Sequence, residues 1–133
     1  MSGSFFDSNV LLYLVTPDSP KADRVERLLQ APGTISVQVL NECANVLRRK
    51  RRMPWGDVIV FLGELRSQLD VLPLTIDIHD GGLRLAERYG LSIYDSFIVA
   101  AALAAGCGTL WSEDMHHGLV VEDRLRISNP FAV

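Results

Sequence analysis

Four acidic residues occupy places in the sequence where carboxylates are unusual. They lie in or beside apolar segments and are far apart along the chain, at Asp7, Glu42, Asp95 and Asp114. A carboxylate in apolar surroundings costs free energy unless a partner compensates its charge. If the fold gathers the four acids, a divalent cation would relieve their repulsion, and such cations support phosphoryl and phosphodiester chemistry. The sequence therefore predicts a metal site with carboxylate ligands.

Short apolar strands and amphipathic helices alternate between these acids. We expect strands at 3–6, 34–36, 71–74, 109–111 and 125–127, and helices at 10–13, 21–30, 37–52, 55–69, 76–89 and 94–105. This alternation predicts an α/β fold in which a short central parallel β-sheet is flanked by α-helices on both faces. Ligands bind outside the carboxyl ends of such strands, and the acids follow strands or lie near helix starts. The topology thus brings all four to one rim.

Length and composition predict one globular domain over residues 1–133. The net charge is −3, which is not that of a typical nucleic-acid binder, although a local basic run could still contact one. The two cysteines have no metal-ligand spacing, so we expect reduced, buried thiols in a cytoplasmic protein. No segment approaches membrane-spanning length without charge, so no membrane partner is expected.

Four strings carry a resemblance to a known family. They are DSNVLLYL at 7–14, ISVQVLNECANVL around Glu42, YDSFIVAAALAAGC at 94–107 and LWSEDMHHG at 110–118. In this order and spacing the chain resembles PIN-domain ribonucleases, and in particular VapC-type toxins of type II toxin–antitoxin systems, over essentially its whole length. The resemblance implies a PIN-like fold and endonucleolytic cleavage of RNA that depends on Mg²⁺ or Mn²⁺. It also implies a VapB-like cognate antitoxin and a homodimer.

The resemblance also assigns roles to single residues. The acids expected to bind the metal and to catalyse are Asp7, Glu42, Asp95 and Asp114. Ser8 stands where the family commonly has threonine. The residues expected to support the acids are Asn9, Ser112 and Glu113, the last as a further candidate for binding metal or water.

Each acid also has a structural interpretation. Asp7 could cap the following helix, Asp95 could complement a helix dipole in the first turn, and Asp114 could belong to a turn. Glu42, at the flank of an apolar helical stripe, has no comparable explanation. The catalytic interpretation accounts for all four acids at once, so we prefer it.

The basic run at 48–52 has two interpretations of about equal weight. Its members Arg48, Arg49, Lys50, Arg51 and Arg52 could form a solvated helix end that complements the dipole, or could bind RNA phosphates. An acidic antitoxin tail could use the same charges. His116 and His117 follow the last acid, but neighbouring residues rarely point to one centre, so we expect exposed loop residues.

Apolar residues recur at helical spacing between 55 and 69, and we expect them in the core or an interface rather than in a base-stacking platform: Trp55, Ile59, Leu62, Leu65 and Leu69. The family resemblance suggests that helices in this region help to form a groove for the antitoxin. Trp111 is expected in the core, with base stacking as the lesser interpretation.

Two other functions fit the sequence. One is a catalytically silent PIN-like module that binds RNA or protein, and its mark would be the loss of an acid, which is not seen. The other is a phosphoacceptor domain that uses the acid after the first strand as a nucleophile. That chemistry needs a positioned lysine, and neither Lys21 nor Lys50 lies in a motif that would position it.

Overall fold

The computed structural model describes residues 3–16 and 19–132 and is built around a twisted sheet. Within these residues the strand order is β3-β2-β1-β4-β6-β5. The strands are β1 (Ser4–Phe6), β2 (Gly33–Ser36), β3 (Asp70–Leu72), β4 (Thr109–Trp111), β5 (Val120–Val121) and β6 (Leu125–Ser128). All neighbouring pairs are parallel except β5 with β6, which is antiparallel. The predicted parallel sheet is confirmed, and the two-residue β5 was too short for its pattern to reveal.

The helices follow the predicted order closely. They are α1 (Ser8–Leu11), which continues into the 3-10 turn η1 (Leu12–Val15), then α2 (Pro20–Leu28), α3 (Val37–Arg49), α4 (Trp55–Gln68), α5 (Ile76–Tyr89) and α6 (Ile93–Ala104). Side-chain caps begin α2, α3, α5 and α6: Ser19, Ser36, Thr75 and Ser92 each accept a hydrogen bond from a backbone N–H of the first turn. Gly90 ends α5 in the left-handed conformation, as its position predicts.

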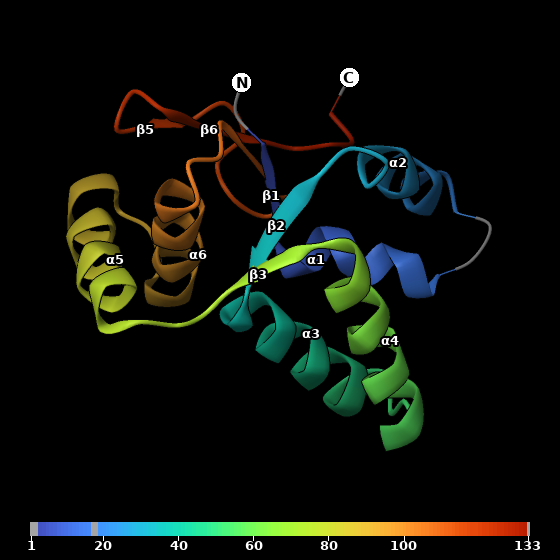
Figure 1. Ribbon diagram of the computed structural model, residues 1–133. Coiled ribbons are helices and arrows are strands. Elements are labelled where there is room, and N and C mark those ends of the chain that lie inside the picture. Colours follow the sequence, from blue (N-terminus) through green and yellow to red (C-terminus); the bar gives the residue numbers. More distant parts are fainter. Residues whose placement is uncertain (1–2, 17–18, 133) are drawn as a thin grey trace.

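Helices cover both faces of the sheet. Figure 1 shows α5 and α6 on one side of the strands and α1 and α2 on the other. Phe5 and Phe6 are consecutive residues of β1 whose side chains point to opposite faces, and both are fully buried. The fold class predicted from the sequence is therefore confirmed.

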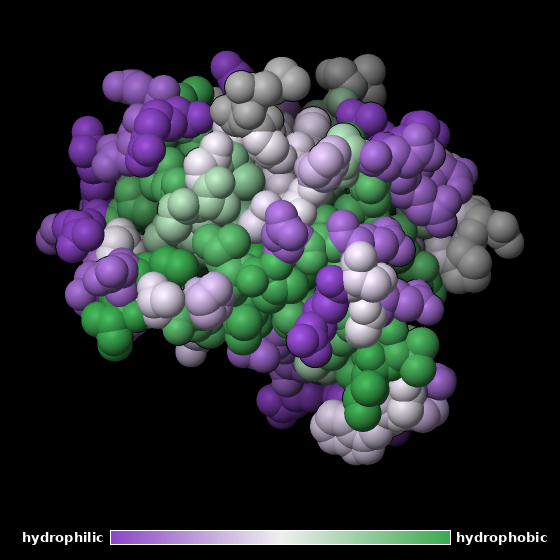
Figure 2. Space-filling view, viewed as in Figure 1, coloured by the Kyte–Doolittle hydropathy of each residue, from purple (hydrophilic) through white to green (hydrophobic). Residues whose placement is uncertain are grey.

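The pair α3 and α4 extends beyond the carboxyl ends of the strands (Figure 1). The apolar residues predicted for the core or an interface divide here between buried and exposed positions. Leu65 and Leu69 are buried, but Trp55 and Ile59 have 63% and 67% of their surface exposed. Val58 in the first turn is also buried, so α4 touches the core along one face while its other face projects into solvent. Figure 2 shows apolar surface over α4, β3 and the connection to α5.

Two further expectations can be compared with the structure. Cys43 and Cys107 are free and buried, as predicted. Among the described residues, no helix combines the length and apolar character that crossing a bilayer requires.

The contact between α5 and α6 explains the glycine pair that weakens the interior of α5. A Cβ on Gly82 would lie 2.4 Å from Phe97 Cδ1 and 3.3 Å from the Ser96 carbonyl oxygen of α6. A Cβ on Gly81 would meet only ordinary contacts, at 3.8 Å from the Arg84 side chain and 4.0 Å from Ala100. Gly82 therefore permits the close approach of the helix that carries Asp95, whereas Gly81 does not contribute to it.

We expect Gly82→Ala and Gly81→Ala to change stability in opposite directions. Gly82→Ala should lower the free energy of unfolding by about 1–3 kcal/mol, because the added methyl overpacks the interface. Gly81→Ala should raise it by about 0.5–1 kcal/mol through helix propensity. Urea unfolding monitored by circular dichroism measures both. Equal effects of the two substitutions would contradict this account of the packing.

Candidate active site

The strand order places the acids next to one another. From β1 the chain continues outward to β2 and β3 on one side, and β4 and β6 lie on the other side. The carboxyl end of β1 beside β4 is therefore the point at which the strand order reverses, where open α/β sheets form a ligand crevice. Asp7 directly follows β1, and its N–H donates to the Trp111 carbonyl oxygen of β4 at 2.9 Å.

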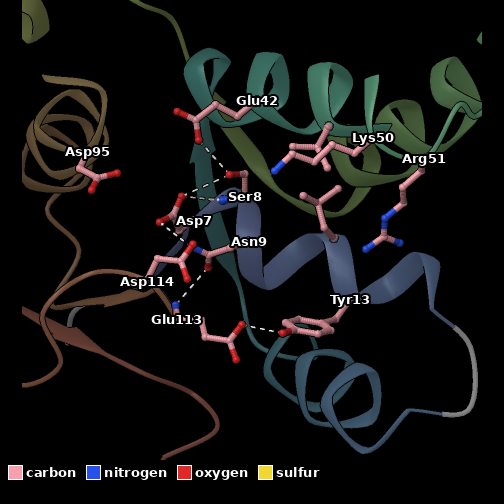
Figure 3. Close-up of a pocket in the computed structure, with 12 residues that line it drawn as sticks. Asp7, Ser8, Asn9, Tyr13, Glu42, Lys50, Arg51, Asp95, Glu113 and Asp114 are labelled. Atoms are coloured by element: carbon pink, nitrogen blue, oxygen red, sulfur yellow. Dashed lines mark hydrogen bonds between the residues drawn. The ribbon is translucent and has the colours of Figure 1, made fainter. Parts of the chain in front are cut away.

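All four predicted acids line one cavity at this edge, of about 340 Å³. Asp7 is contributed by the end of β1, Glu42 by α3, Asp95 by the first turn of α6, and Asp114 by the loop after β4. Figure 3 shows the Asp95 carboxylate facing the other three across the cavity. The structure thus brings together residues that are up to 107 positions apart, as their order in the sequence suggested.

Asp7 is the anchor of this cavity, and its carboxylate is held from several sides. It is 3% exposed. Its Oδ1 accepts from the Ser8 N–H at 2.7 Å, which makes Asp7 the N-cap of α1. Its Oδ2 accepts from Ser112 Oγ at 2.8 Å and from Asn9 Nδ2 at 3.2 Å. The predicted supporting residues Asn9 and Ser112 therefore contact Asp7 directly.

The pKa of Asp7 is raised from 3.8 to about 6, chiefly by burial. The negative charges of Glu42 and Asp95 contribute to this rise, whereas the hydrogen bonds from Ser112 and Ser8 oppose it. Cys43, buried nearby, experiences the same field. Its burial, followed by the charges of Asp7 and Glu42, raises the pKa of the thiol to about 12. The cavity therefore has a strongly negative interior that favours a cation.

Ser8 links the first two acids, and the sequence alone did not indicate this. Its hydroxyl donates to Glu42 Oε1 at 2.8 Å and lies 3.4 Å from Asp7 Oδ1. The other oxygen of Glu42 accepts from Gln38 Nε2 at 2.8 Å. Gln38 and Glu42 are four residues apart on α3, and this helical spacing could have identified the pair.

Glu113 occupies a different position from the four acids. Its Oε1 accepts from the Tyr13 hydroxyl at 2.6 Å (Figure 3). Its Oε2 is 2.5 Å from Lys21 Nζ, so both oxygens have partners. Its backbone N–H donates to Asn9 Oδ1 at 3.0 Å. The ion pair with Lys21 holds the carboxylate at the rim of the cavity, away from Asp7. Nothing in the sequence pairs residues so far apart, so Tyr13 and Lys21 were missed.

The predicted basic run divides into two groups. Lys50 and Arg51 line the cavity with the acids, and the Lys50 side chain points into it (Figure 3). Arg48 and Arg49 line a separate cavity on the surface of α3, and Arg52 lies in the turn that follows, with a φ of 52°. Lys50, which lies in no motif that would position it, thus lines the same cavity as Asp7.

The histidines lie outside this cavity. His116 and His117 are exposed, and His117 Nδ1 accepts from the Asn129 N–H at 2.8 Å. This contact tethers the end of the chain to the loop after β4. The expectation of exposed loop residues is confirmed.

The donor set suits a hard cation such as Mg²⁺ or Mn²⁺. In the part of the chain that the structure describes, no group of three Asp, Glu, His or Cys side chains is close enough to hold one ion. Mg²⁺ is commonly held by one or two carboxylates together with waters and substrate phosphate, so a complete protein cage is not required. The buried Asp7 and its neighbour Glu42 provide such a pair, and a cation beside them would offset the burial of charge.

Comparison with known proteins identifies the family. A family model described as PIN domain matches residues 4–119, which include all four acids. The chain belongs to the PIN-domain family. No curated protein sequence matches it.

Solved structures share the fold of this PIN domain. A chain of a toxin–antitoxin complex from Klebsiella pneumoniae is 18% identical, with 98% of this chain and 100% of that chain covered and a TM-score of 0.72. VapC20 of Mycobacterium tuberculosis, a toxin that cleaves the sarcin–ricin loop, is also 18% identical, with 84% and 90% covered and a TM-score of 0.69. VapBC2 of Rickettsia felis is 21% identical, with 95% and 97% covered and a TM-score of 0.67.

We expect Asp7→Asn to stabilise the metal-free protein at neutral pH. A pKa of about 6 means that the folded chain binds the Asp7 proton more tightly than the unfolded chain, so ionisation destabilises the fold as pH rises from about 4 through about 6. The substitution keeps a cap and removes the buried charge, which should raise the free energy of unfolding at pH 8 by about 1–3 kcal/mol.

Urea unfolding in EDTA at pH 5 and pH 8 measures this effect. The gain should be larger at pH 8, and the exposed Asp80→Asn should show no such dependence. A variant less stable than the wild type at pH 8 would mean that the hydrogen bonds of the carboxylate outweigh its desolvation.

Proposed function

We propose that this PIN domain is a Mg²⁺- or Mn²⁺-dependent endoribonuclease that acts as the toxin of a toxin–antitoxin pair. The observation that carries the proposal is the convergence of Asp7, Glu42, Asp95 and Asp114 on one cavity at the carboxyl edge of the sheet. A bound divalent cation would supply an activated water and charge compensation for the phosphate. The similarity to VapC20, a toxin that cleaves the sarcin–ricin loop, supports the choice of RNA.

Different residues of the cavity would bind the cation, orient the attacking water and compensate the charge of the phosphate. Asp7, oriented by Ser112, Asn9 and Ser8, would hold the cation with Glu42. Asp95 and Asp114 would orient the attacking water and accept its proton. As the water oxygen bonds to phosphorus, one backbone P–O bond breaks and the leaving oxygen takes up a proton. Lys50, in the same cavity, would balance the charge of the phosphate.

A phosphoacceptor role for Asp7 would need a nearby lysine, and Lys50 lines the same cavity. A nucleophilic carboxylate needs a free, accessible oxygen. Asp7 is 3% exposed and lies in the field of Glu42 and Asp95, whose negative charges repel an incoming phosphate. Several carboxylates around one cavity are better suited to holding a cation than to a single nucleophilic attack.

An antitoxin partner is supported by the structural neighbours, several of which are toxin–antitoxin complexes. We propose that it docks in the groove between α2 and α4, a cavity of about 400 Å³. Leu29 lines one wall, Phe61 and Leu65 line the other, and Glu26 and Glu64 add negative charge. This lining fits a partner segment that combines apolar and basic side chains.

Two further parts of the proposal follow from the family. The exposed apolar residues Leu74, Ile76, Ile93 and Tyr94, near the starts of α5 and α6, would form a homodimer interface. A toxin that cuts cellular RNA would act in the cytoplasm.

We expect Asp95→Asn to reduce RNA cleavage by about 100-fold or more, since even outer-shell partners of metal ligands contribute about 10- to 100-fold. The matched control is Asp77→Asn, because Asp77 occupies the first turn of α5 as Asp95 does that of α6. If Asp95 only complements a helix dipole, both variants will cut RNA at the wild-type rate.

Purified proteins are assayed on labelled RNA with Mg²⁺ or Mn²⁺ and with EDTA. Cleavage should require the metal and should be lost only in Asp95→Asn. Tight RNA binding without cut ends in any metal would instead identify a silent binding module.

We expect Phe61→Glu to abolish neutralisation by the antitoxin while leaving cleavage intact, because a charge in the apolar wall of the groove opposes docking. Ile59→Glu, on the exposed side of the same helix, is the control. Growth is measured with each toxin variant co-expressed with its antitoxin, and cleavage is measured separately. Full neutralisation of the Phe61→Glu toxin would show that the antitoxin binds elsewhere.

A further inference from the structure

The end of the α3–α4 pair combines an exposed aromatic ring with dense positive charge. Trp55, at the start of α4, is 63% exposed although it is large and apolar. Arg48 and Arg49 of α3 line a surface cavity of about 450 Å³ with it, and Ala44 and Asn45 complete the lining. The acid cavity lies elsewhere on α3 and shares none of these residues.

Trp55 is held in a defined orientation. The guanidinium carbon of Arg48 lies 4.2 Å from the centroid of the Trp55 ring. Arg48 Nη1 donates to the Met53 carbonyl oxygen at 2.7 Å, so the guanidinium is itself fixed. An arginine over the ring is a favourable cation–π contact, and the large exposed area that remains is open to a second planar group. The pair is therefore a preformed stacking platform.

The platform is continuous with the acid cavity around the circumference of α3. Glu42, Val46 and Lys50 recur every fourth residue and line the acid cavity. Successive side chains of a helix are rotated by about 100° around its axis. Asn45 and Arg49, which line the surface cavity, therefore lie on the face of α3 that adjoins the face of Glu42, Val46 and Lys50. A chain leaving the acid cavity across α3 would meet Arg49 and Asn45 before Trp55, over about the 10 Å diameter of a helix.

We propose that Trp55, Arg48 and Arg49 form a subsite for a nucleotide of single-stranded RNA that flanks the cleaved bond. Its base stacks on the open surface of Trp55, its phosphate pairs with Arg49, and the Asn45 amide hydrogen-bonds the base or the sugar. Stacking on an aromatic side chain beside basic groups is how proteins hold unpaired bases. The inference rests on the proposal that the acid cavity takes RNA.

Charge favours RNA over a protein as the occupant. The segment 48–52 carries five positive charges in a chain whose net charge is −3, and Arg48 and Arg49 line this cavity without an acid among its lining residues. A polyanion that reaches the acid cavity gains from these charges, and the binding would weaken with salt. An apolar protein surface would gain nothing from the charges, and an acidic tail would gain from the charges but not from the exposed Trp55 ring, whereas RNA can use both.

The test is fluorescence anisotropy of a labelled oligouridine about 12 nucleotides long, measured in EDTA so that no cleavage occurs. Trp55→Ala should weaken binding about tenfold, as loss of one stacked base implies. Trp55→Phe should recover most of the affinity, and the exposed Ile59→Ala should bind as the wild type does. Arg49→Ala should reduce the slope of log affinity against log salt by about one.

The outcomes separate this subsite from the function as a whole. Wild-type affinity of Trp55→Ala in a protein that binds and cuts RNA overturns the subsite alone. Absence of RNA binding and cleavage by the wild type overturns the ribonuclease proposal and the subsite with it. A change in molar mass of Trp55→Ala by light scattering, with unchanged RNA affinity, also overturns the subsite and assigns Trp55 to a protein interface.

Discussion

The burial of the Asp7 carboxylate is the constraint on which this structure depends. A charge in a protein interior must be hydrogen-bonded or compensated. Here three residues from two short segments meet that need: Ser8 and Asn9 from the chain that follows β1, and Ser112 from the end of β4. Asn9 also binds the backbone of Glu113, so the loop after β4 is tied to α1 through the same residue. The geometry of the cavity follows from satisfying one buried charge.

The strand order allows short connections to bring the acids together. β1 lies between β2 and β4, so the connections after three adjacent strands open at one edge. A cap, a helix turn and a loop can then each contribute one acid without any long excursion of the chain. The remaining repulsion is not removed by the protein, since the charges of Glu42 and Asp95 still raise the pKa of Asp7. The free chain thus retains electrostatic energy that a bound cation would release.

The other charged residues around the cavity occupy separate positions. Lys21 and Tyr13 bind both oxygens of Glu113, so this fifth acid does not add its charge to the centre of the cavity. On α3 the basic residues are distributed by helical rotation, with Lys50 directed to the acids and Arg48 stacked on Trp55. One helix thereby offers different chemistry on adjoining faces. The net negative charge of the chain therefore does not indicate that positive residues are concentrated on α3.

Local patterns in the sequence were sufficient for the elements and for the acids. Caps such as Ser36 and Thr75, the left-handed Gly90 and the apolar periodicities depend on neighbouring residues, so the helices and parallel strands were predictable. The acids were visible because a carboxylate beside a strand end is unusual in itself. The family of the chain followed from the same strings.

Only the tertiary structure decided which residues meet across the chain and which sides are exposed. The contacts of Glu113 with Tyr13 and Lys21 join residues about a hundred positions apart, and no local pattern encodes such a pairing. The exposure of Trp55 depends on how far α4 projects from the body, because the same apolar spacing would serve a buried helix equally well. Local spacing determines which residues share a face of a helix, whereas packing determines what that face contacts.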